Sequence, residues 1–563
     1  MNKKWQIYDT KQEKIEEIES KYNLNKLLST ILVNRNIITK KDIELFLNPT
    51  RQDFYDPFLI KDMDIAIKRI IKAIENKEKV TIYGDYDVDG ITSITVLKSF
   101  LKDVGLEAKH YIPNRLNEGY GLNKPAIEKI AQEGCDLMIT VDCGISGNEE
   151  IEYANSLGIE TIITDHHEPG NELPKALAVI DNKRKDSEYP FRELAGVGVV
   201  FKVIQALGKT LGLKEESYLK YLDIVCVGTI SDIVPLVDEN RVITKLGLML
   251  VKQTKNIGLK SIINSSGYKN IDSTTISFGV APRINACGRM GKAEEALDLF
   301  LSTDINEVND LTNKLNAHNK ERQETEKAIF ENAIEKIESE KLNENRTIIV
   351  GGENWHHGVI GIVSSKITDM YFKPSILLSF EEDGIGKGSG RSISGFDLHE
   401  ALMKCLDSIE KFGGHSMAIG ITIKKDNLEK FKKEFEKVAE EKHIEEIIPI
   451  INIDAKINLS DINKEMVESL SKLEPFGEAN KTPIFAFKNL KIDSIRALSE
   501  GKHLKLTLKD NNTIIDAIGF NIGKLAEEYR IGDKVDIAGI LEINTFNGVQ
   551  KLQINIKDIM KSI

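Results

Sequence analysis

The sequence of 563 residues predicts an α/β protein, with a parallel-sheet domain, a smaller α/β domain and a C-terminal β-barrel. Three observations predict this order. Short apolar runs alternate with helical patterns in the first half, a long charged helical stretch follows, and apolar and polar residues alternate near the end. At about 100–200 residues per domain, the length also requires several domains.

The composition is that of a folded protein without a membrane-spanning segment, with 41% hydrophobic and 29% charged residues. The net charge of −12 excludes a histone-like basic coat, although screening still permits a narrow basic groove. The five cysteines lie far apart without a Cys-x-x-Cys pair, which favours neither disulfides nor zinc. Because the sequence lacks both a secretory signal and an apolar run of about 20 residues, we expect a cytoplasmic protein.

The parallel-sheet domain is predicted over residues 76–305, after a charged helical segment over residues 1–75. Its strands are expected at 80–83, 136–141 and 160–164, and helical patterns separate them. Each of these apolar runs ends at an acidic residue. Since parallel sheets bind ligands at the carboxyl ends of their strands, these acids are expected at a functional edge.

A long helix over residues 306–342 is expected to connect this domain to the second α/β domain, because only a thin apolar face interrupts its charged residues. The second domain is predicted over 343–444, with a strand at 346–350, a helix at 358–365 and a strand at 376–378.

The C-terminal region, residues 445–563, is predicted to form a small β-barrel. Alternating apolar and polar residues at 502–509 and 534–541 are typical of barrel strands with one buried face.

Three carboxylates alternate in residues 84–90 (GDYDVDG), just after the first strand. In an extended chain, Asp85, Asp87 and Asp89 would face the same side. They would repel one another unless a cation lay among them, and such oxygen ligands favour Mg²⁺ or Mn²⁺. A calcium-type loop or a solvated turn is the alternative, but the preceding strand fits poorly with an EF-hand.

Further candidate ligands follow later apolar stretches: Asp142, residues 165–168 (DHHE) and Asp232. Asp142 alone could equally be a helix cap or turn residue. We interpret these residues, together with the acidic motif at 84–90, as four strand ends whose side chains converge on one site. Two divalent ions about 3.5–4 Å apart in such a site would polarise a phosphoryl group and activate a water molecule. The sequence therefore predicts hydrolysis of phosphodiesters or phosphoanhydrides.

At this point the sequence resembles the DHH phosphoesterase superfamily, named for the Asp-His-His at 165–167. Within it, the chain is similar to the RecJ family of bacterial single-strand-specific exonucleases. The motifs that carry this second resemblance are residues 111–121 (YIPNRLNEGYG), 194–199 (LAGVGV), 281–290 (APRINACGRM), 389–392 (SGRS) and 412–415 (FGGH). The resemblance covers nearly the whole chain and implies a DHH catalytic domain, a DHHA1 substrate-binding domain and an OB-fold.

The resemblance implies two metal ions, Mn²⁺ or Mg²⁺, with Asp142 as the bridging ligand and Asp232, rather than Asp223, as the fourth-motif ligand. Many members carry His where this chain has Tyr83, so Asp85 is expected to compensate. The implied ligands are Asp85, Asp87, Asp89, Asp142, His166 and Asp232. His167 is expected to contact the scissile phosphate or a metal. The implied catalytic residues are His167 and five of the ligands: Asp87, Asp89, Asp142, His166 and Asp232.

The resemblance also implies substrate contacts. Arg115 would read the 5′ end, and Ser389 and Arg391 would bind the terminal phosphate, as suits the planar guanidinium. The remaining implied substrate-binding residues are Arg283, Asn285, Arg289 and His415. For Arg115 and Arg391 the alternative is a surface salt bridge, and for His415 it is a packed turn. Any one of Arg283, Asn285 and Arg289 could instead support the domain junction. The barrel offers Phe485, Phe487, Lys488, Lys491, Arg496, Lys502, Lys505 and Phe546, although aromatic residues in a small barrel are more often core.

The implied function is a 5′→3′ exonuclease that is specific for single-stranded DNA and releases 5′-mononucleotides in recombinational and mismatch repair. Its implied partners are single-stranded DNA with a 5′ end, a single-strand DNA-binding protein and a RecQ-type helicase. Two alternatives stay open: a DHH enzyme for oligoribonucleotides or cyclic dinucleotides, and a non-catalytic strand-binding scaffold. Some relatives carry a further C-terminal domain, which is not expected here because the last predicted strand lies close to residue 563.

Overall fold

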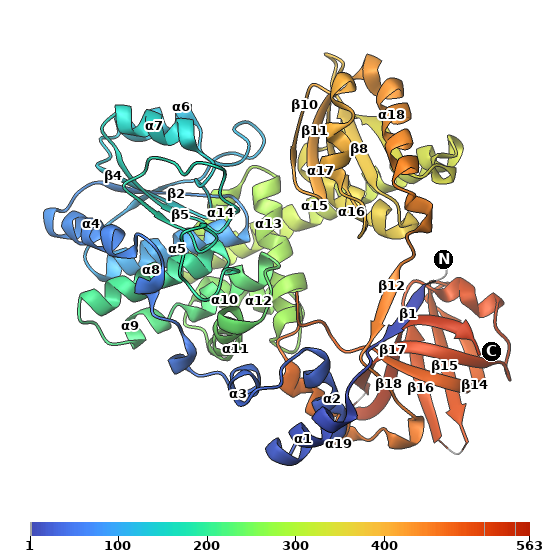
Figure 1. Cartoon of the computed structure of the whole chain (residues 1–563). Coiled ribbons are helices and arrows are strands. Elements are labelled where there is room, and N and C mark those ends of the chain that lie inside the picture. Colours follow the sequence, from blue (N-terminus) through green and yellow to red (C-terminus); the bar gives the residue numbers. More distant parts are fainter. Residues whose placement is uncertain (1–2, 512, 547, 563) are drawn as a thin grey trace. The chain divides into compact units, whose positions relative to one another are not determined.

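The computed structural model describes residues 3–511, 513–546 and 548–562, and the side chain of Phe546 lies outside the described part. Contacts divide the chain into two compact units (Figure 1). We call Tyr55–Val234 and Leu246–Ile447 the sheet unit, and the described residues of Met1–Phe54, Pro235–Lys245 and Ile448–Ile563 the barrel unit.

The first sheet of the sheet unit is parallel throughout, with the strand order β3-β2-β4-β5-β6. Its strands are β2 (Val80–Gly84), β3 (Lys109–Tyr111), β4 (Leu137–Val141), β5 (Glu160–Thr164) and β6 (Ala178–Ile180). β2 and β4 are buried along their whole length, as expected where helices cover both faces of a parallel sheet. The predicted α/β class and the three predicted strands are confirmed.

Helices surround this sheet and extend the unit. They are α4 (Met63–Asn76), α5 (Val88–Asp103), α6 (Lys124–Gln132), α7 (Asn148–Ser156), α8 (Gly196–Thr210), α9 (Glu216–Leu219), α10 (Leu222–Ser231), α12 (Ile257–Ser265), α13 (Ala281–Arg289) and α14 (Ala293–Leu301), with α11 (Asp238–Val251) crossing the boundary between the units.

One predicted strand end is wrong: the apolar stretch before Asp232 is the helix α10, so Asp232 follows a helix. Every residue of Leu222–Ile230 is buried. A helix that is apolar on all sides shows no 3.6-residue periodicity, and a short apolar run of this kind cannot be distinguished from a buried strand by pattern alone.

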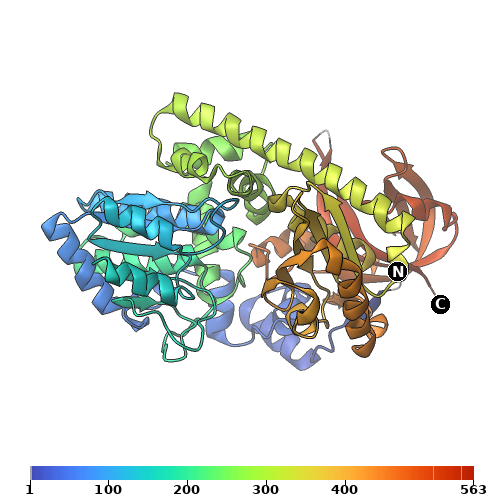
Figure 2. The same ribbon diagram turned by 90° about the horizontal axis from the view of Figure 1, so that it is seen from above.

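The long helix α15 (Ile305–Ser339) runs without a break between the first sheet's helices and the second α/β part (Figure 2). Its apolar side contributes Val308, Leu311 and Leu315 near the start and Ile329, Ala333 and Ile337 near the end. None of the helices in the described ranges combines the length and the apolar character that a membrane span requires.

The second sheet has the order β10-β11-β9-β8-β7, in which β7 and β8 are parallel and the other pairs antiparallel. Its elements are β7 (Ile348–Glu353), α16 (His357–Tyr371), β8 (Ser375–Phe380), β9 (Ile385–Arg391), α17 (Leu398–Met403), β10 (Lys411–Gly414), β11 (Ala418–Lys424) and α18 (Leu428–Glu441). α16 packs on β8 and β9, and Gly361 of this helix lies beside the side chains of Ser389 and Arg391 near the end of β9.

The barrel unit contains a closed barrel, in which β14, β15, β16, β18 and β17 pair in turn and β17 pairs back with β14. Its elements are β1 (Lys4–Ile7), α1 (Gln12–Tyr22), α2 (Lys26–Asn34), α3 (Lys40–Leu47), β12 (Ile450–Ile453), β13 (Ala455–Lys456), α19 (Lys464–Ser469), β14 (Phe485–Leu498), β15 (His503–Asp510), β16 (Thr513–Gly519), β17 (Lys534–Phe546) and β18 (Val549–Lys561). The predicted barrel is confirmed, but the N-terminal residues are not entirely helical, because β1 pairs with β12.

Candidate metal centre and adjoining basic cleft

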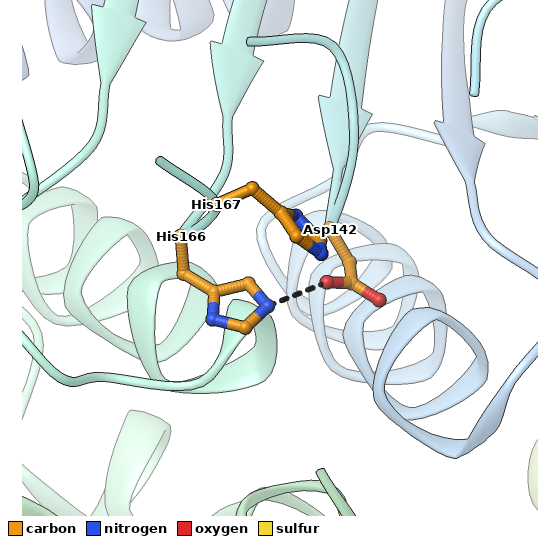
Figure 3. A group of neighbouring side chains, drawn as sticks. All are labelled: Asp142, His166 and His167. Carbon is orange, nitrogen blue, oxygen red and sulfur yellow. Dashed lines mark ion pairs between the residues drawn. The ribbon is translucent and has the colours of Figure 1, made fainter. Parts of the chain in front are cut away.

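Neighbouring parallel strands bring the predicted ligands to one edge of the first sheet. Asp85 follows β2, Asp142 follows β4, and Asp165 and His166 follow β5, which are adjacent strands in the order β2-β4-β5. Figure 3 shows the ring of His166 turned toward the carboxylate of Asp142, with His167 beside it. The shared edge explains why residues about 80 positions apart in the sequence meet.

A first group consists of Asp85, Asp87 and Asp142, whose ligand oxygens lie within 4.8 Å of one another. Asp87 is the N-cap of α5 and accepts hydrogen bonds from the backbone N–H groups of Asp89 (2.9 Å) and Gly90 (3.1 Å). Asp142 has φ +59, a left-handed conformation that Asp tolerates better than most residues. The turn after β4 thereby directs this carboxylate into the group.

A second group consists of Asp89, His166 and Asp232, again with ligand atoms within 4.8 Å. His166 Nε2 lies 3.1 Å from Asp142 Oδ1, 3.7 Å from Asp232 Oδ2 and 3.8 Å from Asp89 Oδ2. Asp142 and His166 therefore stand where the two groups meet. The predicted ligands do converge, from strand ends and from two helices.

The expected extended arrangement of the three alternating carboxylates is wrong. The chain turns into α5 at Val88, which places Asp89 in the first helical turn and separates it from Asp85. Asp89 instead accepts hydrogen bonds from the N–H groups of Gly196 (2.6 Å) and Val197 (2.8 Å), at the start of α8. A Cβ on Gly196 would lie 2.7 Å from Asp142 Oδ1, so glycine is required for this close approach.

Asp165 orients His167 and was not assigned a role from the sequence. Its Oδ1 lies 2.7 Å from His167 Nδ1 and also accepts the backbone N–H groups of His166 and His167. The hydroxyl of Tyr120 lies 3.3 Å from the ring nitrogens of His167. Burial opposes the positive charge of His167, but the contact with Asp165 prevails and raises its pKa to about 9.

The electrostatics of the two groups call for a cation. Burial, followed by repulsion from the neighbouring carboxylates, raises the pKa of Asp85, Asp142 and Asp232 well above the ordinary value, and that of Asp89 to about 7. Burial lowers the pKa of His166 to about 3, so its imidazole is neutral, as a metal ligand must be. Oδ1 of Asp85 is buried and accepts no hydrogen bond from the described residues. These side chains fit divalent ions.

The raised pKa values predict a pH-dependent response to metal. Without metal, the folded protein holds protons that the unfolded chain has released, so stability falls as pH rises from about 4 to about 7. A divalent ion relieves the repulsion and contributes about 2.7 kcal/mol at 100 times its Kd. Melting in EDTA and in MnCl₂ at about pH 5 and about pH 7.5 is expected to give a clearly larger metal-induced rise in Tm at the higher pH.

Asp142→Asn supplies the control, because it removes one buried charge with little change of shape. Its metal-free form is expected to melt at or above the temperature of the unmodified protein at the higher pH, and to respond weakly to Mn²⁺. An equal rise in Tm at both pH values for the unmodified chain would contradict the electrostatic account.

A cleft of about 610 Å³ adjoins this centre within the sheet unit. Three guanidinium groups, of Arg115, Arg289 and Arg391, line it, and no carboxylate of the described residues forms an ion pair with any of them. Burial lowers the pKa of Arg289 to about 10, and the neighbouring arginines contribute to this shift, while burial and Arg115 lower the pKa of Arg391. Three unpaired cations in one hollow are suited to an anion such as phosphate.

Local contacts fix each arginine. Arg391 donates to Ser389 Oγ (2.8 Å), Arg289 donates to the carbonyl of Gly358 (2.8 Å), and the guanidinium of Arg115 lies over the Tyr86 ring at 5.1 Å. The surface salt-bridge alternative is therefore wrong for Arg115 and Arg391 in the described structure. The contact of Arg289 with Gly358 fits its own alternative, support of the domain junction.

Some predicted substrate residues lie elsewhere. Arg283 donates to Asn316 (2.6 Å) and to the carbonyl of Gly279, which ties α13 to its neighbours. Asn285 and His415 do not line the cleft, although Gly414 beside His415 does. Three polar side chains of the cleft were not predicted from the sequence, which are those of Tyr120, His357 and Lys387. Tyr120 lies in the 111–121 motif and His357 directly precedes the helix predicted at 358–365, and these two positions are the sequence signals for them.

In the barrel, Phe485 and Phe487 are fully buried core residues, as most aromatic residues of a small barrel are. Lys488 pairs with Asp536 (2.6 Å) and Lys505 with Asp516 (2.8 Å). Lys491, Arg496 and Lys502 are exposed and Phe546 lies outside the described side chains, so the exposed basic residues are the available contacts for an anion.

Family models match three parts of the chain. The DHH family, N-terminal domain, matches residues 79–229, the DHHA1 domain matches 344–441, and the RecJ OB domain matches 453–558. Together they cover the first sheet, the second sheet and the barrel.

Two relatives match most of the chain. The single-stranded-DNA-specific exonuclease RecJ of Bacillus subtilis (strain 168) is 40% identical over 561 residues, which is 99% of this chain and 70% of that protein. The protein of the same name from Thermus thermophilus is 32% identical, with 91% of this chain and 73% of that protein covered.

Crystal structures of RecJ from Thermus thermophilus are also similar. The complex with Mn²⁺ has a TM-score of 0.86 at 28% identity, over 100% of this chain and 80% of that chain, and the complex with Mg²⁺ has a TM-score of 0.79 at 26% identity, over 100% and 79%. The acidic groups described above are compatible with such ions. The chain therefore belongs to the RecJ family and is an enzyme, a metal-dependent exonuclease of the hydrolase class.

Proposed function

We propose that this chain degrades single-stranded DNA from its 5′ end and releases 5′-mononucleotides by two-metal hydrolysis. One observation carries the proposal: Tyr120 lines the basic cleft while its hydroxyl lies 3.3 Å from His167, so the anion-binding hollow and the metal centre are contiguous. A terminal phosphate held in the cleft would place the next phosphodiester bond toward the metal ligands. Because the 5′-terminal phosphate lies in the cleft and the adjacent bond lies at the metal ligands, hydrolysis would proceed in the 5′→3′ direction.

In this proposal Asp85, Asp87 and Asp142 hold one ion, and Asp89, His166 and Asp232 hold the other. When bound, the ions polarise the phosphoryl oxygens and lower the pKa of a water molecule. Asp142 keeps the two sites together, as its contact with His166 supports.

The remaining groups orient the strand. His167, kept protonated by Asp165, would place a positive charge at the scissile phosphate. Ser389, Arg391 and Arg115 would bind the 5′-terminal phosphate. The predicted contacts of Asn285, Arg289 and His415 with the strand belong to the same proposal, whereas Arg283 would act by holding α13 in place.

Substrate length and strandedness test this function. A long 5′-labelled single strand is expected to release labelled mononucleotide in Mn²⁺, and a blunt duplex of the same sequence is expected to resist. Faster turnover of a dinucleotide than of the long strand would favour the small-substrate DHH enzymes. Strand binding without any nucleotide release would favour the non-catalytic scaffold and contradict the proposal.

The cellular role is proposed from the family resemblance. It comprises recombinational and mismatch repair in the cytoplasm, with a single-strand DNA-binding protein and a RecQ-type helicase supplying the single strand. The domain bounds predicted above, 76–305, 306–342, 343–444 and 445–563 after the segment 1–75, are part of the same proposal.

A further inference from the structure

The loop that carries Arg115 and Tyr120 is exposed over much of its length, at Leu116, Asn117, Gly119 and Tyr120. It connects β3 to α6 and includes Gly119 and Gly121, which have φ +81 and +83. A Cβ at either glycine would meet nothing within 4 Å, so close packing does not restrict the loop at these two Cα positions. Glycine loses more conformational freedom on folding than any other residue, so a loop with two glycines is costly to hold in one conformation. The Tyr86 ring orients the Arg115 guanidinium, but the backbone of the loop needs a further restraint.

The carboxylate of Glu118 supplies that restraint, because it joins both ends of the loop. Oε2 accepts the backbone N–H of Asn114 (2.7 Å), and Oε1 accepts the Tyr111 hydroxyl (2.7 Å) and the amide of Asn123 (3.2 Å). Tyr111 ends β3 and Asn123 caps α6, accepting the N–H of Ala126. One half-buried side chain therefore connects a strand end, the loop and a helix start.

Tyr83 extends this restraint to the metal centre. Its hydroxyl donates to the carbonyl of Gly121 (3.0 Å) and accepts from Asn123 (3.2 Å), and its ring stacks on Tyr111 at 5.3 Å. Tyr83 lies in β2, two residues before Asp85, and is fully buried. The side chain at this position is thus turned toward the loop, and it ties the loop to the strand that carries a metal ligand.

We propose that Glu118 is a positioning residue that holds the 112–121 loop so that Arg115 reaches the 5′-terminal phosphate, an inference that rests on the proposed function. Glu118 does not line the cleft and acts through Arg115. Hydrogen bonds to a charged group are among the stronger ones, so their loss is expected to weaken phosphate binding about tenfold. The predicted defect is in KM for 5′-phosphorylated strands, with kcat changed by less than about twofold.

The test uses one oligonucleotide with either a 5′-phosphate or a 5′-hydroxyl, and compares the unmodified chain with Glu118→Gln. The ratio of kcat/KM between the two strands is expected to fall at least about fivefold in Glu118→Gln. Glu128→Gln is the matched control, because Glu128 is exposed on α6 just beyond the loop, and it is expected to keep the ratio. In an Arg115→Ala background, Glu118→Gln is expected to lower the ratio no further.

A purely structural role for Glu118 would reduce kcat/KM for both strands equally, and that result would overturn the inference. An unchanged ratio in Glu118→Gln would overturn it as well. Should Glu118→Gln fail to fold, Tyr111→Phe removes a single donor to the same carboxylate and is expected to lower the ratio in the same direction. Absence of nucleotide release from both strands by the unmodified chain would instead overturn the proposed function.

Discussion

Asp142→Ala is expected to lower DNA hydrolysis by about 10³-fold or more while the protein keeps its fold. Asp142 belongs to the group with Asp85 and Asp87 and lies 3.1 Å from the imidazole of the second group. Its loss would remove ligand atoms from both proposed ion sites. Metal ions contribute several kcal/mol to such reactions, and each 1.36 kcal/mol is about tenfold in rate. Single-turnover release of 5′-label in Mn²⁺ measures the effect.

Asp223→Asn is the matched control for this variant, since Asp223 is also a buried carboxylate of the sheet unit with a raised pKa. The Asp223 carboxylate accepts a hydrogen bond from the Thr254 hydroxyl and lies outside the metal-ligating groups. Circular dichroism and the melting temperature check that both variants fold. Hydrolysis that persists in Asp142→Ala, or that disappears only in Asp223→Asn, would contradict the ligand assignment.

Arg391→Met is expected to raise KM for 5′-phosphorylated strands about 100-fold and to change kcat little. Arg391 is half-buried in the cleft, is held by Ser389, and pairs with no carboxylate of the described residues. A charge-assisted contact with phosphate contributes about 1.5–3 kcal/mol, and 1.4 kcal/mol is tenfold in affinity. Arg391→Lys is expected to restore only part of the loss, because an ammonium lacks the planar fork of the guanidinium.

Lys424→Met provides the control for charge alone. Lys424 ends β11, the strand paired with β9, but it is exposed and lies outside the cleft. Its replacement removes the same charge from the same sheet and is expected to leave KM unchanged. An equal effect of both substitutions would show that general electrostatic attraction, rather than a defined phosphate site, governs binding.

The metal centre could be predicted from the sequence because most of its ligands lie directly after short apolar strands, which are recognisable from local pattern. β2, β4 and β5 are short apolar runs that each stop at an acidic residue, and parallel strands place such ends at one edge. The barrel was predictable for a similar reason, since β15 alternates buried and partly exposed residues.

Other features could not be predicted from the sequence, because they depend on contacts between residues that lie far apart in the chain or on burial that leaves no local pattern. Asp89 is held by hydrogen bonds from the backbone N–H groups of Gly196 and Val197, which lie more than a hundred residues later in the chain. Asp232 follows a helix whose uniform burial removed any periodicity. β1 forms against β12, which is about 440 residues away in the chain, and the orientation of Tyr83 depends on Gly121 and Asn123.

Crystals grown with MnCl₂ and measured at the manganese absorption edge test the central claim most directly. Two anomalous peaks about 3.5–4 Å apart are expected, one beside Asp85 and Asp87 and the other beside Asp89, His166 and Asp232, with Asp142 between them. The absence of any peak at these side chains in crystals saturated with MnCl₂, or a single peak away from Asp142, would contradict the two-metal assignment.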